Sequence, residues 1–120
     1  MARALARVLG WNLVAAPTAS GADVLYLLAY FEAQKLKSWP RIPVAAYFTH
    51  REEQPPNNAK ARLYDKVAKQ VQLRIATCRM YAEALSQYGP TVQVAPPLER
   101  DRFVIAKRKP SRELVVGLSG

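Results

Sequence analysis

Sulfur and imidazole are scarce in this chain, which has one cysteine, Cys78, and one histidine, His50, among 120 residues. A single cysteine excludes an internal disulfide and a zinc cluster built on cysteines. A cysteine nucleophile would need a histidine partner, and His50 is the one candidate. The simpler interpretation of Cys78 is a small buried or half-buried side chain. The low cysteine content fits a reducing compartment, so we expect a cytoplasmic protein.

Long apolar runs are also missing. No stretch approaches the roughly 18 apolar residues that span a bilayer. The longest uncharged run includes residues 11–22, and this part contains proline, threonine, serine and glycine. The first ten residues carry two arginines without a sustained apolar core behind them, which does not predict a secretory signal. Any membrane contact is therefore expected to be peripheral, at the inner face.

Several catalytic signatures are absent as well. The sequence has no GxGxxG, no GxxxxGK[ST], no HExxH and no GxSxG pattern. Dehydrogenases that bind dinucleotides, P-loop NTPases, zinc proteases and serine hydrolases therefore all lack the motif that their chemistry requires.

Acidic residues are few: nine stand against eighteen lysines and arginines, for a net charge of +9. The excess is densest near the C-terminus, at Arg100, Arg102, Lys107, Arg108, Lys109 and Arg112. Such a balance favours anionic partners, namely nucleic acid, acidic lipid or phosphorylated small molecules. The simpler alternative is that these basic residues belong to a solvated linker and bind no partner. The basic residues lack the interleaved aromatics of RNA-binding surfaces, so nucleic acid is the weaker expectation.

What is present is an alternation of short apolar runs with segments of helical period. The predicted strands are residues 11–16, 22–28, 43–48, 71–76, 91–95 and 114–118. The predicted helices are residues 2–9, 31–37, 59–70 and 77–88. Nearly continuous apolar strands are typical of a parallel sheet covered on both faces. The order predicts an α/β fold with a Rossmann-like, mostly parallel, doubly wound sheet that is incomplete.

Punctuating residues set the expected helix ends. Gly10 should stop the first helix, and Asn57 or Asn58 should cap the helix at 59–70. Thr77 is expected to cap the next helix. Two apolar stripes should face the core: Leu63, Tyr64, Val67 and Val71 in one helix, and Met80, Tyr81, Ala84, Leu85 and Tyr88 in the other.

The chain divides into three expected parts. Residues 1–98 form a Rossmann-like domain that lacks its first strand, because a doubly wound domain normally begins with a strand and this one begins with a helix. Residues 99–113, rich in proline and charge, form a linker. Residues 114–120 supply the first strand of a further domain, so we expect the chain to be a fragment or to need a partner that completes it.

Four segments resemble the N-terminal, acceptor-side domain of GT-B glycosyltransferases of the retaining class. They are ADVLYLLAYF (22–31), PVAAYFTH (43–50), LRIATCRMYAEALSQYGPTVQVAPPLERDRF (73–103) and ELVVGLSG (113–120). The third is the most specific, since it matches a strand, helix and strand that lead to a "PPGVD-xx-RF" turn. The chain departs from that turn with Leu98-Glu99-Arg100 in place of Gly-Val-Asp.

The resemblance implies transfer of a sugar from a nucleotide-diphosphate donor to an acceptor hydroxyl, with retention of configuration at the sugar. No cofactor and no metal ion are implied. Basic side chains and backbone N–H groups of a C-terminal donor domain would stabilise the departing diphosphate. This chain would supply the wall that holds the acceptor, and alone it is expected to be inactive.

His50 follows a predicted buried strand, at the edge where open α/β sheets bind ligands. With the resemblance it becomes the catalytic candidate, because imidazole can handle protons near neutrality. Thr49 intervenes where many relatives place the histidine directly after the phenylalanine, so either Thr49 or His50 faces the cleft. Thr49 and Arg51 are the candidate acceptor-binding residues, and Gly117 and Gly120 could approach the donor diphosphate.

Two other interpretations stay open at this point. Solvated charge explains Arg51, Glu52 and Glu53 without any ligand. The whole chain could instead be a small basic α/β binding module for nucleic acid or an anionic membrane surface, since its charge is +9. Steeply salt-dependent binding without a response to nucleotide-sugars would favour the module.

Overall fold

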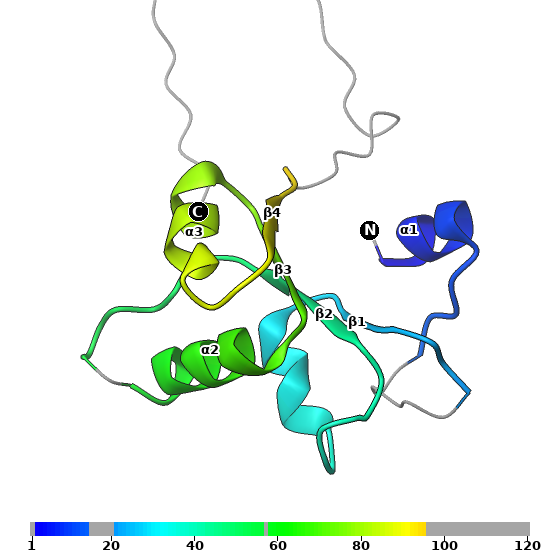
Figure 1. Ribbon diagram of the computed structural model, residues 1–120, viewed down its shortest axis with the longest axis horizontal. Helices are drawn as coiled ribbons and strands as arrows, with labels where there is room; N and C mark the ends of the chain where they lie inside the picture. The colour runs from blue at the N-terminus through cyan, green and yellow to red at the C-terminus, as the bar shows by residue number, and fades with distance from the viewer. Residues whose placement is uncertain (1, 15–20, 57, 96–120) are drawn as a thin grey trace, which may run out of the picture.

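The computed structural model describes residues 2–14, 21–56 and 58–95. In this part of the chain the strands are β1 (Leu25–Leu27), β2 (Val44–Phe48), β3 (Leu73–Ala76) and β4 (Thr91–Gln93). The helices are α1 (Ala2–Leu9), the 3-10 helix η1 (Tyr30–Lys35), α2 (Ala59–Gln70) and α3 (Arg79–Ser86), as Figure 1 shows.

The four strands form one sheet in the order β1-β2-β3-β4, and every neighbouring pair is parallel. The predicted α/β class is therefore confirmed. Each connection between strands contains a helix, as parallel pairing requires. Strands that advance in one direction place their connecting helices on one face. The arrangement is compatible with part of a Rossmann-like sheet on one side of its point of reversal.

One face of this sheet carries the core. Phe48 on β2 is fully buried, and its ring stacks on Tyr30 of η1 at 5.7 Å and meets Tyr64 of α2 edge-on at 5.0 Å. Leu85 of α3 belongs to the same buried cluster. η1, α2 and α3 thus pack on the same side of the sheet (Figure 1). Alternate strand residues point into this core, which explains the alternating burial along β2.

The opposite face is apolar but less covered. Tyr26, Tyr47 and Ile75 are half-buried and Val92 is exposed. These residues alternate with the core positions and lie side by side through the strand register. Burial raises the pKa of both Tyr26 and Tyr47, with Tyr47 adding to the effect on Tyr26. α1 lies on this side of the molecule, apart from η1, α2 and α3 (Figure 1).

Arg74 of β3 breaks the apolar pattern of the core, because its side chain is only 2% exposed. Its Nε donates to the Ala68 carbonyl and its Nη2 to the Val71 carbonyl, both at 2.7 Å. Its Nη1 reaches the Pro90 carbonyl at 3.4 Å. Burial lowers the pKa of Arg74, and the carbonyls at the end of α2 are the partners that a buried cation needs. The guanidinium joins α2 to the turn before β4.

Helix ends confirm some expectations. α2 has the predicted bounds, and Asn58 caps it by accepting a hydrogen bond from the Ala61 N–H at 2.8 Å. Gly10 follows α1 with φ of 65°, a conformation that glycine adopts without a steric penalty. Asn57, the other candidate cap, lies outside the described residues.

Other expectations about single elements were wrong. The predicted strand at 11–16 is not formed by the described residues 11–14, where the Trp11 ring contacts Tyr26 edge-on instead of joining a ladder. The expected helix at 31–37 is a short 3-10 helix that ends at Lys35. Pro40 and Pro43 follow closely and favour extended backbone before them, which leaves little room for a longer helix.

The start of α3 also differs from the prediction. Thr77 does not cap the helix, since its N–H still bonds the Phe48 carbonyl of the sheet at 3.3 Å. Cys78 takes the cap position without a side-chain bond, and it is half-buried as expected. Met80 and Ala84, predicted for the core, are exposed because α3 has two turns and buries only Leu85 fully.

The remaining expectations fall beyond the described residues. These are the linker at 99–113, the strand at 114–120 and the basic cluster from Arg100 to Arg112, together with Gly117 and Gly120.

Candidate functional site

Two polar residues follow β2 at the carboxyl edge of the sheet. Phe48 pairs with Ala76, so Thr49 and Thr77 come next at the same edge, and His50 follows Thr49. Thr49 and His50 are both exposed. The carboxyl edge is where open parallel sheets bind ligands, because strands end there and loops diverge. The structure therefore brings three hydrogen-bonding residues from two neighbouring strands to a ligand-binding edge.

His50 is uncommitted. Within residues 2–14, 21–56 and 58–95 it takes part in no hydrogen bond, ion pair or ring contact. A histidine that acts as a general base is usually oriented by a second group, as a carboxylate does in a catalytic triad. No described carboxylate holds this imidazole. His50 is thus available to hydrogen-bond a ligand, and the ligand itself would have to fix its orientation.

Arg51, by contrast, is fully engaged. Its Nε and Nη2 donate to the two carboxylate oxygens of Asp65 on α2, at 2.9 and 2.8 Å. Its Nη1 donates to Glu53 at 2.8 Å. These bonds, first to Asp65 and then to Glu53, raise the pKa of Arg51. The same bond to Arg51 lowers the pKa of Asp65. A planar guanidinium suits this two-point contact with a carboxylate.

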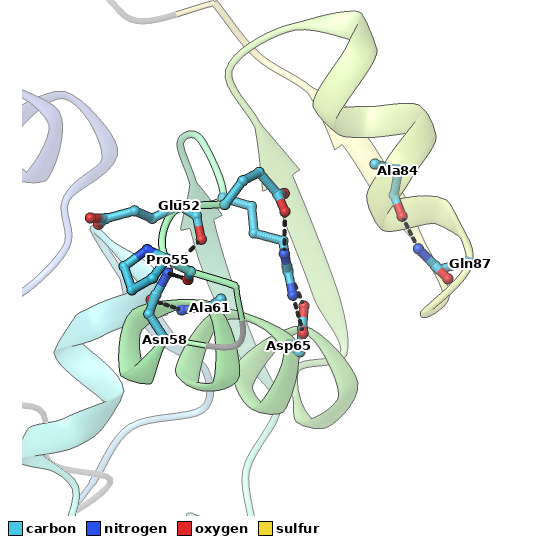
Figure 2. A network of polar contacts seen from close by, with 9 residues as sticks. Glu52, Pro55, Asn58, Ala61, Asp65, Ala84 and Gln87 are labelled. Carbon is cyan, nitrogen blue, oxygen red and sulfur yellow. Dashed lines mark hydrogen bonds and ion pairs between the residues drawn. The ribbon is translucent and has the colours of Figure 1, made fainter.

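Asn58 fixes the far end of the loop that begins at Arg51. Its amide donates to the carbonyls of Glu52 and Pro55, at 3.0 and 2.9 Å, while its oxygen caps α2 (Figure 2). Lys60 adds an ion pair with Glu52 at 2.8 Å. The hydrogen bond to Glu52 raises the pKa of Lys60, and the charge attraction of the same carboxylate adds a smaller increase.

The loop between β2 and α2 is consequently tied to α2 at both ends. Figure 2 shows Asp65 of α2 and Asn58, the residue that caps α2, at the two parts of this loop. Arg51 directly follows His50, so the Arg51–Asp65 pair limits where His50 can lie. Arg51, predicted to bind an acceptor, is used here to hold the loop, and its acceptor contact stays a prediction. The interpretation of Arg51 and Glu52 as solvated charges is incomplete, because Arg51 pairs with Asp65 and Glu52 pairs with Lys60.

α3 begins at the same edge, two residues after Thr77. Its N-terminal backbone N–H groups carry a partial positive charge, and its cap residue Cys78 provides no side-chain acceptor. The first turn contains no acidic residue. The N-terminal N–H groups of α3 and the exposed His50 thus offer hydrogen-bond donors at this end of the sheet, where the carboxylates of Asp65 and Glu53 are paired with Arg51.

A separate shallow hollow of about 230 Å³ lies along β1. Its wall includes Val14, Tyr26, Leu28 and the ion pair of Glu32 with Lys35. Pockets that enclose small molecules commonly start near 300 Å³. The hollow is open, largely apolar and small, so it is a poorer ligand site than the edge with Thr49 and His50.

Metal chemistry finds no support among the described residues, where no group of three or more His, Cys, Asp or Glu side chains could hold an ion. In the same part of the chain, no helix has the length and apolarity needed to cross a membrane.

Sequence reasoning missed Asp65 and Arg74. Asp65 pairs with Arg51 across 14 positions and from a different element, and no local spacing rule indicates such a pair. The signal for Arg74 was a single cation inside an apolar strand.

Comparisons with protein-family models, with curated proteins and with solved structures found no match to this chain.

Proposed function

We propose that this chain is the acceptor-binding part of a GT-B-type glycosyltransferase. One observation carries the proposal: Thr49 and His50 are exposed at the carboxyl edge of a parallel sheet, and His50 forms no hydrogen bond, ion pair or ring contact with the described residues. The motifs at 22–31, 43–50 and 73–103 supply the likeness to the family.

In this proposal, His50 accepts a hydrogen bond from the acceptor hydroxyl and takes up its proton as the oxygen bonds to the anomeric carbon of the donor sugar. The bond between that carbon and the diphosphate breaks in the same transfer, and the nucleotide diphosphate leaves. Thr49 and Thr77 hydrogen-bond other hydroxyl groups and so orient the acceptor. Correct placement of reacting groups can contribute much of a rate enhancement. Arg51 acts as a positioning residue, because its contact with Asp65 holds the segment that carries His50.

The donor, a nucleotide-diphosphate sugar, would be bound by a C-terminal domain outside the described residues. Transfer therefore needs that domain, and we do not expect turnover by this chain alone. We place the activity in the cytoplasm, in keeping with the single cysteine.

Saturation-transfer NMR tests acceptor binding directly on the existing chain. The probes are methyl α-glucoside, methyl α-mannoside and methyl α-galactoside, with UDP-glucose and GDP-mannose as donor probes. We expect a signal for at least one glycoside, its loss in His50→Ala, and no dependence on the nucleotide-sugars. Lys66→Gln, on the outer side of α2, is the control and should keep the signal.

Two results would contradict the proposal. One is no signal from any glycoside. The other is a glycoside signal that His50→Ala and Thr49→Ala leave unchanged. A single-stranded oligonucleotide titrated in parallel addresses the basic-module alternative, for which binding should weaken steeply with salt.

A further inference from the structure

Exposed apolar side chains gather in the first part of the chain, residues 2–14, named here the N-terminal arm. Its exposed members are Val8, Leu9, Trp11, Leu13 and Val14. Val8 is 82% exposed and Trp11 is 53% exposed. Single exposed apolar residues are normal on protein surfaces, whereas several exposed apolar residues close together in one segment are typical of an interaction surface.

The charge of the arm is of one sign. Arg3 and Arg7 are both exposed, and residues 2–14 include no aspartate or glutamate. Residues four apart share one side of a helix, so the two arginines lie together on α1. Val8 and Leu9 fall on the other side, given a turn of about 100° per residue. α1 is thus an amphipathic helix with a basic side.

The arm touches the sheet at its C-terminal half. The Trp11 ring meets the Tyr26 ring edge-on, with 5.7 Å between centroids. Gly10, with φ of 65°, ends α1 just before this contact. α1 itself lies on the side of the sheet opposite η1, α2 and α3 (Figure 1). Trp11 therefore anchors the arm while the apolar side chains of Val8 and Leu9 remain in water.

We propose that the N-terminal arm binds the surface of an anionic membrane. Val8 and Leu9 would enter the boundary between headgroups and acyl chains, and Arg3 and Arg7 would contact anionic headgroups. The exposed part of the Trp11 ring, which keeps its contact with Tyr26, would lie at the level of the headgroups. Basic amphipathic helices with tryptophan bind membranes in this way, and tryptophan favours the interface because its ring is apolar with one polar edge.

Charge decides between a membrane and a second copy of this chain. Two copies that met through their arms would bring four arginines together without an acidic partner in either arm, on chains that each carry +9. An anionic bilayer instead attracts every one of these charges. This inference goes beyond acceptor binding and does not depend on the proposed transferase activity.

Co-sedimentation of the full chain with vesicles tests the inference. One set of vesicles contains phosphatidylcholine with about one-third phosphatidylglycerol, and the other contains phosphatidylcholine alone. We expect binding to the first set that weakens as salt rises above about 0.1 M, where charges are screened beyond about 10 Å. In a Trp39→Phe background, Trp11 fluorescence should shift to the blue on binding.

Matched variants locate the binding. Each basic residue near an anionic surface strengthens binding about fivefold, so Arg3→Gln with Arg7→Gln should weaken it about 30-fold. Lys66→Gln with Lys69→Gln removes the same charge from α2 and should have a clearly smaller effect. Trp11→Ala with Leu13→Ser should weaken binding at least tenfold, and Met80→Ser, which removes an exposed apolar residue of α3, should not.

Three outcomes would overturn the inference. The first is no binding to anionic vesicles. The second is equal weakening by the arm variants and the α2 control, which would mean that net charge alone causes binding. The third is a concentration-dependent dimer, seen by analytical ultracentrifugation, that Trp11→Ala dissociates. In that case the arm would be a protein interface.

Discussion

The two ends of the sheet use their polar residues in opposite ways. At the amino end, Arg74 is buried and its guanidinium donates to three backbone carbonyls. At the carboxyl end, Thr49 and His50 are exposed, and His50 has no partner among the described residues. The comparison separates polar groups that the fold uses for its own hydrogen bonds from polar groups that remain exposed to solvent. Substitutions at the two ends should therefore separate stability from binding.

The largest effect is expected at the amino end, for Arg74→Ala. The substitution leaves the carbonyls of Ala68 and Val71 without their donor and opens a cavity in the core. We expect a loss of about 3 kcal/mol in the free energy of unfolding, measured by urea denaturation. Arg74→Met keeps most of the volume and should cost less. A loss below about 0.5 kcal/mol for Arg74→Ala would show that the hydrogen bonds of the guanidinium do not stabilise the fold.

Gly89→Ala tests the same end from the backbone. Gly89 has φ of 130°, where side chains are strained, and an added Cβ would lie 2.9 Å from Nη1 of Arg74. Because Arg74 is fixed by its carbonyl partners, it cannot move away freely. We expect a loss of about 2 kcal/mol. In an Arg74→Ala background the loss should shrink, and an unchanged loss would assign the whole effect to backbone strain.

The Arg51–Asp65 pair is intermediate, since it belongs to the fold but supports the carboxyl end. Asp65→Asn should cost about 1 kcal/mol at neutral pH, given a two-point contact that is partly exposed. The pKa of Asp65 is lowered in the folded state. The pair therefore stabilises the protein fully at pH values above 3.8, the ordinary pKa of this carboxyl. The stabilisation is lost as pH falls through the lower, folded pKa.

Urea denaturation of wild type and Asp65→Asn at several pH values measures this dependence. The difference between the two should be full above about pH 5 and should decline below 3.8. Asn58→Ala, which removes the α2 cap instead, should lose a pH-independent amount over the same range. A difference between wild type and Asp65→Asn that is constant with pH would rule out the ion pair as its cause.

The smallest effect on stability is expected for His50→Ala and Thr49→Ala. Both side chains are exposed, and substitutions at such positions usually change stability by less than about 0.5 kcal/mol. Thermal unfolding followed by circular dichroism measures this. A loss above about 1 kcal/mol would show that these residues are structural and would remove the contrast between the two ends.

The fold could be predicted in large part because buried positions are occupied by apolar residues, whose spacing in the sequence indicates strands and helices. The runs around Leu25–Leu27 and Val44–Phe48 are apolar, since strands of a parallel sheet are well covered, and α2 has its cap and its stripe in register. The segment 11–16 failed because an apolar run alone does not tell a strand from an extended segment whose tryptophan packs on a neighbour.

The site could be predicted less completely. The place of Thr49 and His50 at a strand end could be predicted because it follows from strand order alone, and their role in binding stays a prediction. Arg51 was assigned to a ligand because Asp65 is distant in sequence, and pairs of that kind form through tertiary packing. Arg74 was missed because the pattern of a strand does not show that carbonyls at the end of α2 lie beside its buried face and accept hydrogen bonds there.

Backbone amide NMR spectra, recorded while a methyl glycoside that binds is added, test the central claim most directly. We predict that shifts will concentrate at Thr49, His50 and Thr77, with the amides of Arg74 and Thr91 at the other end unmoved. Shifts centred on Arg74 and Thr91, or shifts at Thr49 and His50 no larger than elsewhere, would contradict the assignment of the carboxyl edge as the ligand site.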